Sequence, residues 1–67
     1  MSRYGLLAAL YLGRQLPLKI LRANNEFYIG TEDEDGPCSR ESQEYWPTWG
    51  AAEAALAGGQ WTQKESP

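Results

Sequence analysis

A pair of asparagines, Asn24-Asn25, separates two runs of β-forming residues, and this arrangement constrains the fold more than any other feature of the chain. Asparagine tolerates the positive φ angles that a two-residue hairpin turn requires. A turn at this pair aligns four cross-strand pairs: Ala23 with Glu26, Arg22 with Phe27, Leu21 with Tyr28, and Ile20 with Ile29. We therefore predict a β-hairpin over residues 18–31.

The predicted register agrees with the hydrophobic pattern of the two strands. Because side chains alternate between the faces of a strand, four apolar residues share one face: Leu18, Ile20, Phe27 and Ile29. Leu21 and Tyr28 form a smaller patch on the other face. We expect the N-terminal segment of the chain to lie against this second patch.

Two helices are expected beside the hairpin. Residues 5–15 are rich in helix-forming residues, and Pro17 stops a helix there. A second helix, about residues 49–57, has Thr48 as its N-cap and Gly58-Gly59 as its C-terminal cap. Its inward face is expected to carry four residues at helical spacing: Trp49, Ala52, Ala55 and Leu56.

Short strands over residues 38–46 and 60–63 complete the expected fold. The predicted class is α+β: a small antiparallel sheet packed against the helix at about 49–57, with an extra N-terminal helix. Three parts follow along the chain: an apolar helical extension at 1–17, a small α+β domain at 18–63, and a loose tail at 64–67.

The chain lacks the usual means of stabilising so small a domain. Its 67 residues include one cysteine and no histidine, so neither an internal disulfide nor a structural zinc site is expected. Aromatic residues must then supply much of the core, and a homodimer is a second way to gain stability. Among the tryptophans, Trp46 is the expected exception to burial, because Pro47 holds it at a turn.

The N-terminal apolar run, Gly5 to Gly13, follows Arg3 and has the shape of a short signal sequence. It lacks a good cleavage site and is far shorter than the roughly 20 apolar residues that cross a bilayer. A helix that is apolar on all sides favours burial. Three interpretations stay open: a helix docked on the domain or on a second copy, a frayed extension, and contact with a membrane surface.

The acidic segment "TEDEDG" does not match a metal site. With Gly36 at the sixth position of an EF-hand loop, Thr31 is first and Ser42 twelfth, and neither residue type fits its position. A catalytic thiol at Cys38 would need a neighbouring base, and the chain has no histidine. Solvated carboxylates keep pKa values of about 4 and are poor acid-base catalysts. We expect no metal, no cofactor and no enzymatic activity.

The charge balance opposes nucleic-acid binding. Nine acidic and six basic residues give a net charge of −3, whereas affinity for phosphates comes from clustered basic side chains. Lys19 and Arg22 lie on opposite faces of their predicted strand, so they form no basic stripe. The single cysteine is typical of a protein of the reducing cytoplasm.

The acidic segment and the residues after it are the best candidate for a partner-binding surface. A negative surface attracts a basic partner and speeds encounter, and an exposed aromatic residue supplies an anchor. The candidate residues are Glu32, Asp33, Glu34, Asp35, Glu41, Glu44, Tyr45 and Trp46. The alternative is a solvated turn whose charges prevent edge-to-edge pairing of strands.

Three blocks, "KILRANNEFYIGTEDEDGP", "SRES.EYW" and "AAEAALAGGQWTQ", give residues 18–63 a resemblance to short uncharacterised proteins carried by phages, prophages and plasmids. The resemblance implies a cytoplasmic setting in a bacterial cell. It also implies binding to a host or mobile-element protein, in some cases to inhibit a defence system. Residues 1–17 fall outside it.

We therefore expect a small, non-enzymatic protein-binding module with an acidic surface and a basic protein partner. Two alternatives stay open. The first is a structural or regulatory protein that self-associates through residues 5–16, and the second is a nucleic-acid-binding regulator.

Overall fold

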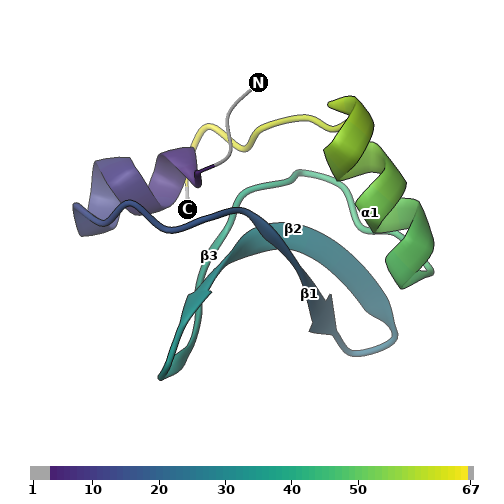
Figure 1. The fold of residues 1–67 in the computed structure, drawn as a ribbon, viewed down its shortest axis with the longest axis horizontal. Helices are drawn as coiled ribbons and strands as arrows, with labels where there is room; N and C mark the ends of the chain where they lie inside the picture. The colour runs from purple at the N-terminus through teal and green to yellow at the C-terminus, as the bar shows by residue number, and fades with distance from the viewer. Residues whose placement is uncertain (1–3, 67) are drawn as a thin grey trace.

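The computed structural model describes residues 4–66, and it has the expected α+β architecture. Three strands form one antiparallel sheet in the order β1-β2-β3. The sheet is strongly curved, and the two helices lie toward opposite ends of the molecule above it (Figure 1). The elements in chain order are η1 (Ala8–Leu12), β1 (Lys19–Ala23), β2 (Glu26–Asp33), β3 (Gly36–Arg40) and α1 (Trp49–Gly58).

The β1–β2 hairpin has the predicted register. All four predicted pairs are present, from Ala23 opposite Glu26 to Ile20 opposite Ile29. Asn24 alone in the turn has a positive φ, 56°, which asparagine adopts more readily than other side chains. The β1–β2 pairing extends from Lys19 opposite Gly30 to the turn, within the predicted residues 18–31, and β2 continues to Asp33 in its pairing with β3.

Both faces of the sheet are covered, but the N-terminal segment lies on the opposite face from the one predicted. Gly5 lies directly against the side chain of buried Thr31, which shares a face with Ile29. The Leu21/Tyr28 patch is buried in another way. The ring of Tyr28 lies beside Gly30, which has no side chain, and the Tyr45 ring meets it edge-on at 5.9 Å between centroids.

The N-terminal helical turns span residues 6–12 and end earlier than the predicted residue 15. Gly13 adopts a left-handed conformation with φ 64°, at little cost for a residue without a Cβ, and this terminates the helix well before Pro17. The turns at Ala8–Leu12 have π geometry. Leu7 and Ala8 are buried, so the segment is docked on the sheet. No helix within residues 4–66 is long and apolar enough to cross a membrane.

Helix α1 begins and ends as predicted. The Thr48 hydroxyl accepts a hydrogen bond from the backbone N–H of Ala51 at 3.1 Å, and Gly59 supplies the left-handed cap. Ala52 and Ala55 face the core. Trp49, predicted on the same face, is instead 51% exposed, because a helix held close to the sheet by alanines leaves no room for an indole between them.

The tryptophans do not follow the predicted distribution, because Trp49 is the exposed one and Trp46 and Trp61 are half-buried.

Two predicted strands are also shorter than expected. Strand β3 ends at Arg40, and the segment after it rejoins β2 through two backbone hydrogen bonds between Trp46 and Phe27. The predicted strand 60–63 is reduced to a single bridge between Ser42 and Gln63.

Candidate functional site

The acidic segment forms the tip of the β2–β3 hairpin. The tip is a two-residue turn at Glu34 and Asp35. The Asp33 carboxylate accepts a hydrogen bond from the backbone N–H of Asp35 at 2.9 Å, which is the local contact that favours an aspartate before a tight turn. Gly36 then continues the chain with φ 123°, a conformation that side chains disfavour.

Half of the charge in this segment is paired with basic side chains. Glu32 binds the ammonium of Lys19 across the sheet, and Asp33 binds the guanidinium of Arg14 beyond the end of η1. The hydrogen bond from Arg14 lowers the pKa of Asp33, and the bond from the Asp35 N–H acts in the same direction. Glu34 and Asp35 are exposed and have no ion pair within residues 4–66.

Glu41 does not face solvent. Its side chain is 0% exposed and accepts hydrogen bonds from the backbone N–H groups of Leu7 and Ala8 at 2.9 and 3.2 Å. The Ser39 hydroxyl and the Gln63 amide also donate to it, at 2.6 and 2.8 Å. Burial tends to raise the pKa of Glu41, but these hydrogen bonds lower it overall, so the group is an internal carboxylate and not part of an acidic surface.

Glu44 is half-buried and also has an internal partner. Its two carboxylate oxygens accept the backbone N–H of Thr62 at 2.9 and 3.0 Å. Burial opposes ionisation, yet the hydrogen bonds from Thr62 bring the pKa of Glu44 below its ordinary value. Of the six predicted acidic site residues, the structure therefore leaves Glu34 and Asp35 exposed and unpaired among the described residues.

The two predicted anchor residues are also engaged with their neighbours. Tyr45 is 40% exposed, but the Arg40 guanidinium lies 4.5 Å from its ring centre and donates to its hydroxyl at 2.7 Å. Trp46 is half-buried and exchanges both backbone hydrogen bonds with Phe27 at 2.8 Å. Within residues 4–66, the contacts of both residues are with the sheet and Arg40, and none is with the exposed acids Glu34 and Asp35.

The N-terminal helix carries an apolar surface whose location the sequence did not reveal. Four large side chains are exposed there: Leu6 by 47%, Leu10 by 66%, Tyr11 by 58% and Leu12 by 48%. The apolar run is evident in the sequence, but a helix that is apolar on all sides does not reveal which of its residues face outward. Residues 4–13 contain no charged side chain, and this is the sequence signal that indicates an apolar surface in this segment.

A hollow of about 160 Å³ separates this helix from β3. It is lined by Leu7, Tyr11, Leu12, Cys38, Ser39 and Arg40. Burial raises the pKa of the Cys38 thiol, and a hydrogen bond with Asp33 adds to that effect, so the thiol stays protonated at neutral pH. The hollow therefore lies beside the exposed side chains of Tyr11 and Leu12 and is not a reactive-thiol site.

The apolar helix and the acidic tip lie at the same end of the molecule. The ion pair between Arg14 and Asp33 connects the chain just after η1 to the β2–β3 hairpin. Figure 1 shows the far end of the N-terminal helix and the hairpin tip on the same side, away from α1. The Arg14–Asp33 ion pair therefore holds the β2–β3 hairpin, whose turn is Glu34-Asp35, against the segment that follows the N-terminal helix.

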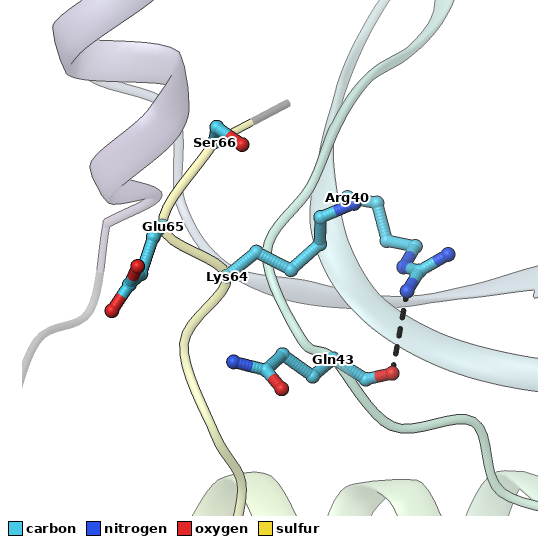
Figure 2. A pocket seen from close by; sticks show the side chains of 5 residues that line it. All are labelled: Arg40, Gln43, Lys64, Glu65 and Ser66. Carbon is cyan, nitrogen blue, oxygen red and sulfur yellow. Dashed lines mark hydrogen bonds between the residues drawn. The ribbon is translucent and has the colours of Figure 1, made fainter.

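A second, wider hollow of about 370 Å³ lies between the β3 end and the C-terminal segment. Figure 2 shows the residues that line it: Arg40, Gln43, Lys64, Glu65 and Ser66. Each guanidinium nitrogen of Arg40 already donates internally, to the carbonyls of Ser42 and Gln43 at 3.0 and 3.3 Å and to Tyr45. This arrangement holds the loop after β3 in place. Within residues 4–66, no group of three acidic or cysteine residues is placed to hold a metal ion.

No family model matches the chain, and neither the curated proteins nor the solved structures contain a significant match to it.

Proposed function

We propose that the chain is a small, non-enzymatic protein-binding module that meets its partner through the exposed apolar side chains of the N-terminal helix, residues 6–12. One observation carries this proposal: four large apolar side chains stand between 47% and 66% exposed on one short helix. Contiguous apolar patches on small proteins mark contact sites, because their burial is favourable by about 25 cal/mol per Å².

The charges beside this face define the partner. Glu34 and Asp35 are exposed at the tip of the hairpin that Arg14 connects to the N-terminal segment, and they have no ion pair within residues 4–66, while Arg14 is neutralised by Asp33. A complementary partner is a protein with an apolar groove that accepts Leu10 and Tyr11 and is bordered by basic side chains. The acidic tip contributes mainly to the rate and orientation of encounter, since exposed charges are screened by salt.

The resemblance of residues 18–63 to phage- and plasmid-borne proteins suggests in which kind of cell the partner is found. The partner is then a protein of a bacterial host or of a mobile element, met in the cytoplasm. Binding would act by occluding a surface of that protein, including one that serves a defence system.

Self-association is the second candidate function, and a separate observation favours it. Residues 4–13 carry no charge, although the whole chain has a net charge of −3. Two like-charged copies can therefore meet through this segment without placing charges of the same sign against each other. The free edge of β1 is a poorer route, because the charged side chains of Lys19 and Arg22 on this edge strand disfavour pairing with another strand.

The first experiment compares three forms of the full chain as bait for proteins of a bacterial lysate. These are the wild type, Leu10→Ser with Tyr11→Ser, and Trp49→Ser as a control. Trp49 is 51% exposed, similar to Tyr11, but begins α1 at the other end of the molecule. We expect one protein to bind the wild type and the Trp49 variant and to be lost from the double variant.

A variant with Glu34→Ser and Asp35→Ser tests the charge, because these substitutions leave both ion pairs of the hairpin intact. We expect weaker binding at low salt and little difference at high salt. Equal capture by all forms would overturn the proposal. Self-association would instead be established if the wild type has a mass in solution of twice 7.5 kDa and the double variant has half that mass.

A further inference from the structure

The buried carboxylate of Glu41 is shared by three segments that are distant in the sequence. It accepts the N–H groups of Leu7 and Ala8 at the start of the N-terminal helix, the hydroxyl of Ser39 on β3, and the amide of Gln63 near the C-terminus. The backbone of Glu41 also contacts the C-terminal segment, because the Lys64 N–H donates to the Glu41 carbonyl at 2.7 Å. One side chain thus contacts both ends of the described chain.

Within residues 4–66, every donor to this carboxylate is a neutral group. Ser39 donates its only hydroxyl proton to Glu41. The neighbouring Thr31 hydroxyl must therefore be the donor in the 2.6 Å contact with Ser39. The network therefore runs in one direction, from Thr31 through Ser39 to Glu41. Only an ionised carboxylate, which accepts at both oxygens, satisfies all four donors at once.

The N-terminal segment packs so closely against the carboxylate that there is no room for a side chain at residue 5. A Cβ atom at Gly5 would lie 2.6 Å from a Glu41 oxygen and 2.5 Å from the Thr31 methyl group. The N-terminal segment therefore reaches the carboxylate only because residue 5 has no side chain. Leu7, which is 1% exposed, is held in the core by the same approach.

We propose that Glu41 is a conformational latch that couples the two ends of the chain, so that loss of the Gln63 contact loosens the N-terminal helix. The start of the helix is held by the carboxylate and by the Gly5 N–H bond to the Leu16 carbonyl at 2.9 Å, and the chain after the helix is held by the ion pair of Arg14 with Asp33. Losing one of these hydrogen bonds leaves the buried carboxylate partly unsatisfied, and that cost favours an opening of the N-terminal helix in which water reaches the charge. The latch is independent of what binds the apolar face of η1.

Hydrogen exchange of backbone amides tests the latch in the full chain. The variant Gln63→Ala removes the C-terminal arm, and the matched control Gln43→Ala removes a 3.2 Å bond to the Gln63 carbonyl without touching the carboxylate. Loss of a hydrogen bond to a charged group corresponds to roughly a tenfold change in an opening equilibrium. We expect exchange of the Leu7–Leu12 amides to rise by about that factor in Gln63→Ala and to stay unchanged in the control.

Amides of the β1–β2 hairpin, such as Tyr28, serve as the internal reference. Unchanged exchange at Leu7–Leu12 in Gln63→Ala would overturn the proposal, as would an equal rise at the hairpin, which signifies global destabilisation only. Glu41→Ala removes all arms together and risks unfolding, so Ser39→Ala provides the second variant. It removes one donor from β3 and is expected to loosen the same helix amides.

Discussion

The backbone N–H of Leu7 donates to the carboxylate of Glu41 at 2.9 Å, across 34 positions of the chain. This contact satisfies one of the free N–H groups at the start of a helix, as an N-cap residue would, but with a side chain from another part of the fold. The N-terminal helix is therefore attached to the sheet by an acceptor that its own sequence does not supply.

The stability of the fold should fall in acid in a way that depends on Glu41. The pKa of this group is lower in the folded chain than the ordinary 4.5, so the unfolded state binds protons first. The stabilisation is present above pH of about 4.5 and is lost as pH falls through the lower folded pKa. Urea unfolding of the wild type and Glu41→Gln across this range measures the effect.

At neutral pH we expect Glu41→Gln to lower the free energy of unfolding by about 2 kcal/mol, because an amide cannot accept all four hydrogen bonds. The difference between the two proteins should shrink below pH of about 4.5. Asp33 and Glu44 also have lowered pKa values and add to acid sensitivity in both proteins, so the comparison isolates Glu41. A difference that stays constant down to pH of about 3 contradicts the assignment.

Two leucines of the N-terminal helix should respond very differently to truncation. Leu7 is 1% exposed and Leu10 is 66% exposed, although both belong to one apolar run. Leu7→Ala should destabilise the fold by about 2–5 kcal/mol, the usual cost of a cavity, whereas Leu10→Ala should change stability by less than about 0.5 kcal/mol. Chemical denaturation measures both, and similar losses for the two variants would show that the outward face of the helix is assigned incorrectly.

Local patterns made the hairpin and α1 predictable. The turn at Asn24 and the alternation of the flanking strands determine the register, and both lie within a few residues of each other. Thr48 and Gly59 mark the ends of α1 through contacts made inside the same helix turn. Such features need no knowledge of the rest of the fold.

The candidate site depended on contacts between distant segments and was less predictable. Glu41 follows a solvated acidic turn and has the appearance of another surface charge, yet its burial results from donors at Leu7 and Gln63. The pairing of Asp33 with Arg14 likewise required knowing where the chain after η1 lies. Periodicity failed for the N-terminal helix because every residue in it is apolar or small.

The N-cap of α1 offers a prediction about local stability. Thr48→Ala removes the acceptor of the Ala51 N–H and should cost about 1 kcal/mol, while Thr48→Ser keeps the hydroxyl and should cost far less. The loss should appear as a lower midpoint of thermal unfolding and as faster amide exchange in the first turn of α1. Equal destabilisation by both substitutions would indicate that the threonine methyl group, and not the cap, is responsible.

The latch also predicts an effect from the opposite end of the chain. Gly5→Ala places a methyl group against Glu41 and Thr31, so the N-terminal segment must move away from the carboxylate. If the ends are coupled, the C-terminal segment should loosen as well, and the amides of Gln43 and Lys64, which bond to Thr62 and Glu41, should exchange faster. Gly50→Ala is the control, because a Cβ there has no neighbour within 4 Å. Faster exchange confined to residues near Gly5 would mean that the two ends are held independently, since a shared carboxylate transmits the disturbance to both.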